Sequence, residues 1–223
     1  MLDENDRSLF GTGQKVRSIK TSTLQSCFRQ DVSILCLWSF LVGSVLLYRH
    51  GIHRQEMMQK AVLTTQTRKE IMGILDTLTA PGCIVEVGCF KCGTTVEIAA
   101  KVPDRTVYAL DAFGGEGAME VFKGVDFGDV QADTAPFPNI KLVRGNICET
   151  VKTINEPIAL ILIDCDETAP CAVALDHLIP QLSEGGKILV DDFDWHSIRD
   201  CTDVQLKNFT IERTPSGLAV TGK

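Results

Sequence analysis

The chain has no excess of basic residues, and this excludes one large class of function. Its 223 residues include 22 lysines and arginines against 29 aspartates and glutamates, which gives a net charge of −7. Proteins that bind nucleic acid present a basic face to the phosphates, because counterion release drives that binding. The sequence shows no such face, so we predict that nucleic acid is not a partner.

The sequence also lacks the paired motifs of a structural zinc site. Nine cysteines are scattered along the chain, but only Cys89 and Cys92 form a C-x-x-C pair, and no cluster of histidines accompanies them. A structural zinc site needs four ligands, so one pair does not predict it. Because the number of cysteines is odd and several lie in apolar runs, we expect mostly reduced, buried thiols.

One long uncharged segment lies near the start of the chain. Val32–Tyr48 has no charged residue over seventeen positions and is flanked by Arg29 and Arg49. A helix of that length is about 25 Å long, close to the thickness of a bilayer core. We therefore expect a single transmembrane helix at residues 32–48 and a location in a membrane. Basic residues balance on its two sides, so neither orientation nor compartment can be predicted.

The remaining residues divide into three parts. Residues 1–31 are polar and are expected to form a flexible tail. Within residues 49–80, Gln55–Leu78 carries apolar residues at a broken helical spacing, which predicts a helix that links the membrane segment to a domain. That domain is expected to occupy residues 81–223.

The domain alternates strands with helices. We predict a helix over Ala169–Leu182, with Gly185-Gly186 as the stop after it, and a terminal hairpin that pairs Lys207–Thr214 with Leu218–Thr221. The predicted fold class is α/β: a doubly wound, Rossmann-like, mostly parallel seven-stranded sheet with an antiparallel C-terminal hairpin. Its parallel strands are predicted at Cys83–Val87, Thr106–Leu110, Ile140–Val143, Ile158–Ile163 and Lys187–Val190.

Acidic side chains gather at the carboxyl ends of these strands, which is where such a sheet binds its ligands. Clustered carboxylates raise one another's pKa unless a cation compensates them. Asp164 and the pair Asp191-Asp192 follow neighbouring strands and offer the oxygen ligands that Mg²⁺ prefers. The residues at this edge are Glu86, Asp111, Asn146, Asp164, Asp166, Asp191, Asp192 and Asp194.

The first two strand ends favour a nucleoside as ligand. Asp111 lies 23 residues after Gly88, at the end of the second strand, where an acidic residue binds ribose hydroxyls. The first turn, Gly88–Gly93, is not G-x-G-x-x-G, because bulky residues stand where a pyrophosphate needs bare backbone. A nucleoside without a pyrophosphate therefore fits better than a dinucleotide.

These segments resemble the class I S-adenosylmethionine-dependent methyltransferases. The resemblance covers about residues 80–196 and rests on EVGCFKCGTTVEIA, LDAFGG, the D-x-D turn in LIDCDE, and LIPQLSEGGKILVDDFDW. Within that class, the double aspartate after LSEGG is similar to the macrocin O-methyltransferase-like branch.

The resemblance implies O-methylation of a small-molecule hydroxyl acceptor, with Mg²⁺ orienting and acidifying that hydroxyl. Self-association into a homo-oligomer is left open. By resemblance, Glu86 and Gly88 line the methionine part of the cofactor, Asp111 holds its ribose, Asn146 lies near the adenine, and Asp164, Asp191 and Asp192 hold the metal.

Several positions depart from the family pattern. Cys92 stands where the family usually has glycine, which predicts less room in the cofactor turn. Thr168 replaces an aromatic residue, and the segment after Trp195 is short, so an abbreviated last helix is expected. Glu167 stands where related metal-dependent enzymes have lysine, which leaves Glu167 and His196 as the candidates for the catalytic base.

Two other functions compete with this interpretation. The C-x-x-C pair at a helix start also occurs in thiol oxidoreductases of the thioredoxin type, although that function leaves the acidic strand ends unexplained. Alternatively, the departures from the family pattern indicate a membrane-anchored scaffold that has lost catalysis.

Overall fold

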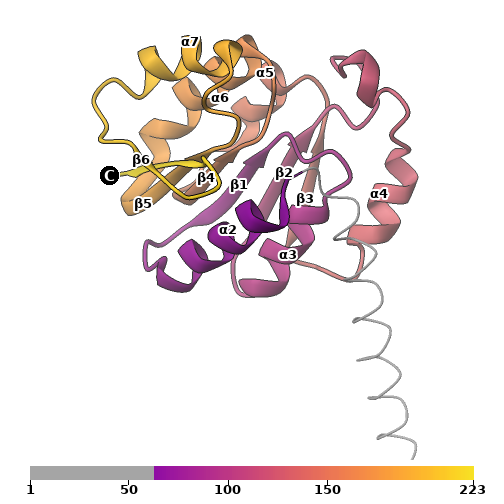
Figure 1. The fold of residues 1–223 in the computed structure, drawn as a ribbon. Coiled ribbons are helices and arrows are strands. Elements are labelled where there is room, and N and C mark those ends of the chain that lie inside the picture. Colours follow the sequence, from indigo (N-terminus) through magenta and orange to yellow (C-terminus); the bar gives the residue numbers. More distant parts are fainter. Residues whose placement is uncertain (1–62) are drawn as a thin grey trace, which may run out of the picture. The chain divides into compact units, whose positions relative to one another are not determined.

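A computed structural model describes residues 63–223, which form one seven-stranded sheet covered by helices on both faces (Figure 1). The strands are β1 (Cys83–Val87), β2 (Val107–Asp111), β3 (Ile140–Arg144), β4 (Ile158–Ile163), β5 (Leu182–Val190), β6 (Glu212–Arg213) and β7 (Ala219–Gly222). The α-helices are α2 (Thr65–Thr77), α3 (Gly93–Lys101), α4 (Phe127–Thr134), α5 (Ile147–Thr150), α6 (Thr168–Leu178) and α7 (His196–Gln205). Three 3₁₀ turns are η1 (Glu120–Phe122), η2 (Val151–Thr153) and η3 (Ile179–Gln181).

The strand order in the sheet is β3-β2-β1-β4-β5-β7-β6. Strands β1 to β5 run parallel, whereas β7 is antiparallel to both β5 and β6. The chain builds outward from β1 through β2 to β3 and then returns to place β4 on the other side of β1. Ligands bind at such a reversal, outside the carboxyl ends of the strands. The predicted mostly parallel sheet with antiparallel C-terminal strands is confirmed. Two bounds differ: β6 covers only Glu212–Arg213 of the predicted Lys207–Thr214, and β5 begins five residues before the predicted Lys187.

Alternating side chains of the central strands pack into two layers. Val85 and Ile161 face the layer that α6 and α7 cover, while Ile84 and Leu160 face α2 and α3. Figure 1 shows α2 and α3 on the near face of the sheet. Every residue of β1 and β4 is buried, as expected for parallel strands with helices on both faces.

The predicted helix over Ala169–Leu182 is too long by four residues. Helix α6 ends at Leu178, and Pro180 lies in the 3₁₀ turn that follows, where its missing N–H ends the helical ladder. Strand β5 then begins at Leu182, and Gly185-Gly186 lies within it instead of after a helix. Gly185 has a φ of +76°, which makes room for a bulge in the pairing with β4.

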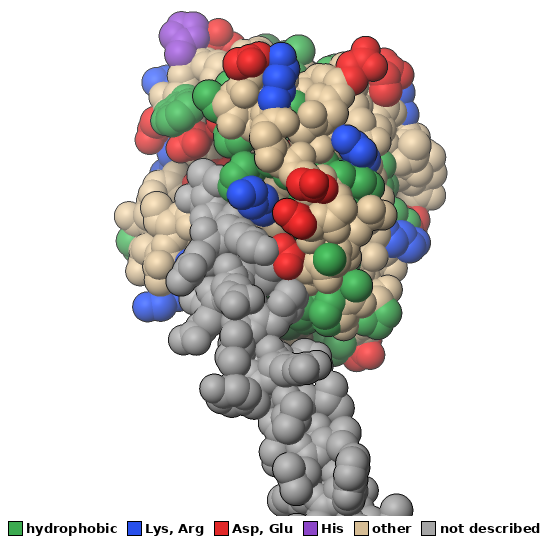
Figure 2. Space-filling view, turned by 90° about the vertical axis from the view of Figure 1, so that its right-hand side faces the viewer, with side chains coloured by type: hydrophobic (Ala, Val, Ile, Leu, Met, Phe, Trp, Pro, Cys, Tyr) green, Lys and Arg blue, Asp and Glu red, His purple; other side chains and the backbone are tan. Residues whose placement is uncertain are grey.

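Two helices differ from the sequence prediction. The sequence prediction assigns no helix to the region after β2, where the structure has η1 and α4. Asp126 caps α4 by accepting a hydrogen bond from the Gly128 N–H at 2.7 Å. Helix α7, expected to be abbreviated, runs for ten residues and buries Ile198 and Cys201 one turn apart. Figure 2, which faces the side with α4, shows a short row of acidic side chains near the middle of this face, with basic side chains scattered among and around the acidic ones.

The predicted tail and transmembrane segment, residues 1–48, lie outside the described residues. Of the linking helix over Gln55–Leu78, the described part forms α2 from Thr65 to Thr77. Within residues 63–223, no helix is both long and apolar enough to cross a bilayer.

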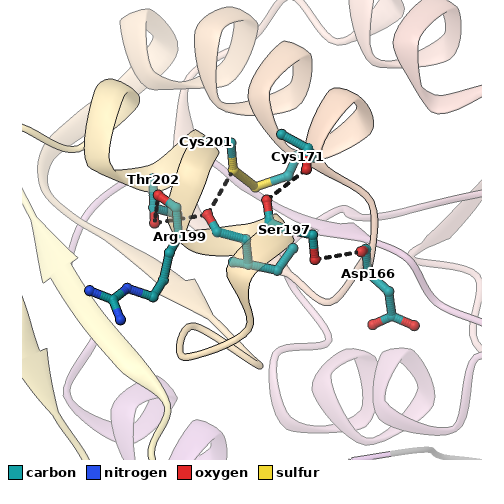
Figure 3. The surroundings of a disulfide bond; sticks show 8 residues. Asp166, Cys171, Ser197, Arg199, Cys201 and Thr202 are labelled. Carbon is teal, nitrogen blue, oxygen red and sulfur yellow. Dashed lines mark hydrogen bonds between the residues drawn. A yellow bond between two sulfur atoms is a disulfide. The ribbon is translucent and has the colours of Figure 1, made fainter.

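Residues 63–223 contain one disulfide, where the sequence predicts mostly reduced thiols. It joins Cys171 on α6 to Cys201 on α7, across 30 positions of sequence (Figure 3). Five other cysteines of the described region are free thiols. The pairing requires α6 and α7 to lie side by side, which spacing in the sequence does not reveal.

Candidate active site

A cavity of about 680 Å³ opens at the carboxyl ends of the five parallel strands. Each strand contributes a residue to its wall, because parallel strands all end at the same edge of the sheet. These residues are Gly88 after β1, Asp111 at the end of β2, Asn146 after β3, Asp164 after β4 and Asp191 after β5.

Gly88 allows the first turn to pass close to the end of β4. Its φ is +87°, and a Cβ at this position would lie 2.2 Å from the carbonyl oxygen of Asp164. That oxygen belongs to the backbone and cannot rotate away, so only glycine fits here. Gly88 is therefore needed for the shape of the turn as well as for the cavity wall.

Asp111 holds this turn by its carboxylate. One oxygen, Oδ2, accepts hydrogen bonds from the N–H groups of Cys89 and Phe90, each at 2.9 Å. The other oxygen, Oδ1, accepts from the N–H of Phe113 at 2.7 Å. Burial raises the pKa of Asp111, while these three N–H groups oppose that shift by stabilising the charged form. The end of β2 and the turn after β1 thus form one unit.

Cys92 does not occupy the cavity. Its side chain is fully buried beside Cys89, Phe113 and Val130, on the side of the turn that faces α4. The departure from glycine appears instead in the backbone, where Cys92 has a φ of +60°. The expected loss of room for a cofactor is therefore not what the structure shows.

The C-x-x-C thiols are poorly placed for redox chemistry. Cys89 is buried, and its thiol contacts the carbonyl oxygens of Glu86 and Leu110, each at 3.4 Å. Burial raises the pKa of the Cys89 thiol well above its usual value. Thiol oxidoreductases use an accessible thiolate, so this environment argues against that function.

Asn146 caps α5 and also lines the cavity. Its Oδ1 accepts a hydrogen bond from the N–H of Cys148 at 2.9 Å. A loop residue, Gly117, lies over it, since a Cβ there would come within 3.3 to 3.5 Å of Asn146. The loop after β2 therefore packs against the end of β3.

Four aspartates line the opposite half of the cavity: Asp164, Asp166, Asp191 and Asp192. Burial raises the pKa of each one, and neighbouring carboxylates raise it further for all but Asp166. The pKa of Asp191 reaches about 6, through burial first and then Asp192. Among residues 63–223, no three acidic, histidine or cysteine side chains converge as metal ligands. The carboxylate oxygens of these four aspartates nonetheless suit a hard divalent cation, which would relieve the repulsion between the four carboxylates.

Glu86 lies behind the cavity and does not line it. Its side chain is 1% exposed, and the hydroxyl of Thr95 donates a hydrogen bond to Oε2 at 2.5 Å. Burial, reinforced by Asp111, raises the pKa of Glu86 to about 7. Any effect of Glu86 on a ligand would pass through the first turn.

The structure separates the two candidates for the base. Glu167 lines the cavity, directly before α6. His196 does not line it: its side chain is 90% exposed, and Nδ1 lies 2.9 Å from a carboxylate oxygen of Asp200. His196 lies at the start of α7 with its side chain in solvent, so the structure does not place it beside the other predicted site residues.

Sequence reasoning missed several apolar residues of the wall. Leu63 lies at the entrance to α2, Phe122 lies on η1, and Trp195, which is 53% exposed, precedes α7. A tryptophan three positions after the double aspartate of a strand end is the sequence signal that could have identified Trp195. Nothing in the sequence links Leu63 or Phe122 to this edge of the sheet.

Comparisons with known proteins show what this domain is similar to. A family profile described as "Methyltransferase domain" matches residues 85–193, a range that runs from within β1 to just after β5 and includes Asp111, Asp164, Asp191 and Asp192. No curated protein sequence matches the chain.

Solved structures share the fold. The apo structure of CalS11, a TDP-rhamnose 3'-O-methyltransferase of calicheamicin biosynthesis, is 18% identical, covers 77% of this chain and 93% of its own, and has a TM-score of 0.56. The O-methyltransferase NovP is 17% identical over 76% of this chain and 78% of its own, with a TM-score of 0.59. PaMTH1 of Podospora anserina, bound to S-adenosylhomocysteine, is 15% identical over 76% and 85%, with a TM-score of 0.56. At these identities the likeness establishes the fold alone.

The strain at Gly88 gives a direct prediction. We expect Gly88→Ala to lower the free energy of unfolding by about 3 kcal/mol, since the new Cβ meets backbone at a positive φ. Gly73→Ala is the matched control: Gly73 is exposed on α2, nothing lies within 4 Å of its Cβ position, and alanine should stabilise the helix by about 1 kcal/mol. Urea denaturation measures both, and equal effects of the two substitutions would contradict this account.

The raised pKa of Glu86 predicts a pH-dependent stability. The folded state binds the Glu86 proton more tightly than the unfolded chain does. The stability that this proton gives the folded state is therefore fully present below about pH 4.5 and is lost as pH rises through about 7. Glutamine cannot ionise, so Glu86→Gln should not lose this stability. The free energy of unfolding of the variant should therefore rise relative to wild type, by up to about 3 kcal/mol, as pH increases. Denaturation of both ligand-free proteins between pH 5 and 8 measures this, and parallel pH profiles would disprove it.

Proposed function

We propose that this domain is an S-adenosylmethionine-dependent methyltransferase that methylates a hydroxyl group of a small molecule. The methyltransferase profile and the fold support the transfer chemistry. The observation that carries the proposal is the position of Asp111, which binds the first turn and borders the cavity where a nucleoside would lie. When bound, S-adenosylmethionine would supply an electrophilic methyl group: the acceptor oxygen would bond to the methyl carbon as the bond from that carbon to sulfur breaks, and the hydroxyl proton would pass to a base such as Glu167.

We assign the half of the cavity at β1, β2 and β3 to the cofactor. Gly88 leaves room for the methionine part, Asp111 faces the ribose and Asn146 lies near the adenine, as the family resemblance implies. Glu86 acts from behind, through the turn. This half would orient the methyl group toward the ends of β4 and β5.

We assign the other half to the acceptor and to Mg²⁺. Asp164, Asp191 and Asp192 would hold the metal, which when bound supplies positive charge beside the acceptor hydroxyl and favours its ionisation. The buried, mutually repelling carboxylates support this assignment, because a divalent cation compensates them. Glu167 is the better candidate for the base, since it lines the same cavity.

Two finer assignments are also proposals, and one other function competes with the main one. The likeness of the LSEGG-to-double-aspartate segment supports the macrocin O-methyltransferase-like branch. The uncharged segment at residues 32–48 supports single-pass membrane attachment, which protease protection in isolated membranes would test. A catalytically inactive scaffold is the second candidate function; its specific support is the replacement of the family's lysine by Glu167.

Binding of S-adenosylhomocysteine tests the proposed cofactor. We expect Asp111→Ala to weaken binding at least about tenfold, because it removes both the ribose partner and the acceptor of three N–H groups. Asp200→Ala, at an exposed site on α7, is the control and should leave affinity unchanged. Isothermal titration measures both, and absence of binding to the wild-type chain would refute the proposal and favour the scaffold.

The charge of the cavity predicts which acceptors react. Six carboxylates line it, and no lysine, arginine or histidine side chain of residues 63–223 does so. Phosphorylated acceptors should therefore react at least about tenfold more slowly in kcat/KM than their uncharged counterparts. A methyl-transfer screen of matched acceptor pairs, with Mg²⁺ present and with it chelated, measures this. A preference for the phosphorylated member would contradict the assignment.

A further inference from the structure

The two loops that carry the acceptor half of the cavity are each followed directly by a helix. The turn Asp164–Asp166 leads into α6, and the segment Asp191–Trp195 leads into α7. The position of each loop therefore depends on how these two helices lie against each other. Both helices pack on the same face of the sheet, and their contact is covalent, through Cys171 and Cys201 (Figure 3).

Two hydrogen bonds extend this link to the cavity. The hydroxyl of Thr168 donates to the carbonyl oxygen of Ser197 at 2.9 Å, and the hydroxyl of Ser197 donates to the carbonyl oxygen of Asp166 at 3.0 Å. In Figure 3 the Asp166 carboxylate points away from the helix pair that holds its backbone. Trp195, two residues before Ser197, lines the same cavity. The disulfide lies one turn further along each helix from these bonds.

The cofactor half is held by different bonds. Asp111 binds the N–H groups of Cys89, Phe90 and Phe113, and none of these residues lies on α6 or α7. Asn146 is fixed by its own cap on α5. Loosening the contact between α6 and α7 should thus disturb one half of the cavity and spare the other.

We propose that Cys171 and Cys201 are positioning residues whose disulfide fixes the acceptor half of the cavity and places methyl transfer under thiol–disulfide control. The proposal rests on the proposed function, which assigns that half to the acceptor and the metal. A cellular dithiol reduces the bond: it gives two electrons, becomes a disulfide itself, and each freed sulfur takes a proton. A low-molecular-weight disulfide, such as oxidised glutathione, reverses the step.

Amide hydrogen exchange of the full chain, with and without dithiothreitol, tests this proposal without any substitution. Reduction should speed exchange at least about tenfold in residues 164–170 and 192–198, and change it less than about twofold in residues 86–93 and 107–119. A disulfide that only adds global stability would speed exchange in all four segments alike, which would overturn the proposal. Unchanged exchange after peptide mapping has confirmed reduction would overturn it as well.

Variants and ligand binding complete the experiment. Cys171→Ala/Cys201→Ala should reproduce the exchange pattern of the reduced chain and lose its response to dithiothreitol. Cys83→Ser, which removes a buried free thiol on β1, should keep the wild-type response. The affinity for S-adenosylhomocysteine should change less than about twofold on reduction. If neither form binds it, the proposed function fails while the exchange data still decide the role of the disulfide.

Discussion

The carboxylate of Asp111 is the interaction on which the candidate site depends. It ties the end of β2 to the turn after β1 through three backbone N–H groups, and this fixes the turn that Gly88 makes possible. Residues with a positive φ, Phe90 and Cys92, lie in that turn and are held there by the surrounding bonds and packing. This wall of the cavity is therefore held in shape by the protein's own hydrogen bonds and packing.

The other wall is governed by charge. Four aspartates are brought together at the ends of β4 and β5 by the parallel strands, and burial makes each of them harder to ionise. A cation in this half would lower that cost, while a negatively charged ligand would increase it. The same electrostatic constraint thus links the proposed metal to the proposed preference for uncharged acceptors.

Local sequence patterns predicted the strands well and the tertiary contacts poorly. Ile158–Ile163 is an unbroken apolar run, so its bounds were predicted correctly. Gly185-Gly186 resembles a helix stop locally, but pairing with two neighbouring strands makes it a bulge. The family resemblance marked Cys92 as a departure from glycine without showing which way its side chain points. The Cys171–Cys201 bond depends on helix packing, which no local pattern encodes.

The claim that a nucleoside cofactor lies at the ends of β1, β2 and β3 has one direct test. Radiolabelled S-adenosylmethionine would be crosslinked to the chain by ultraviolet light and the labelled peptides mapped. The account predicts label in residues 86–93, 111–119 or 145–148, and its loss when excess S-adenosylhomocysteine is added. Label that appears elsewhere, or that persists under competition, would contradict it.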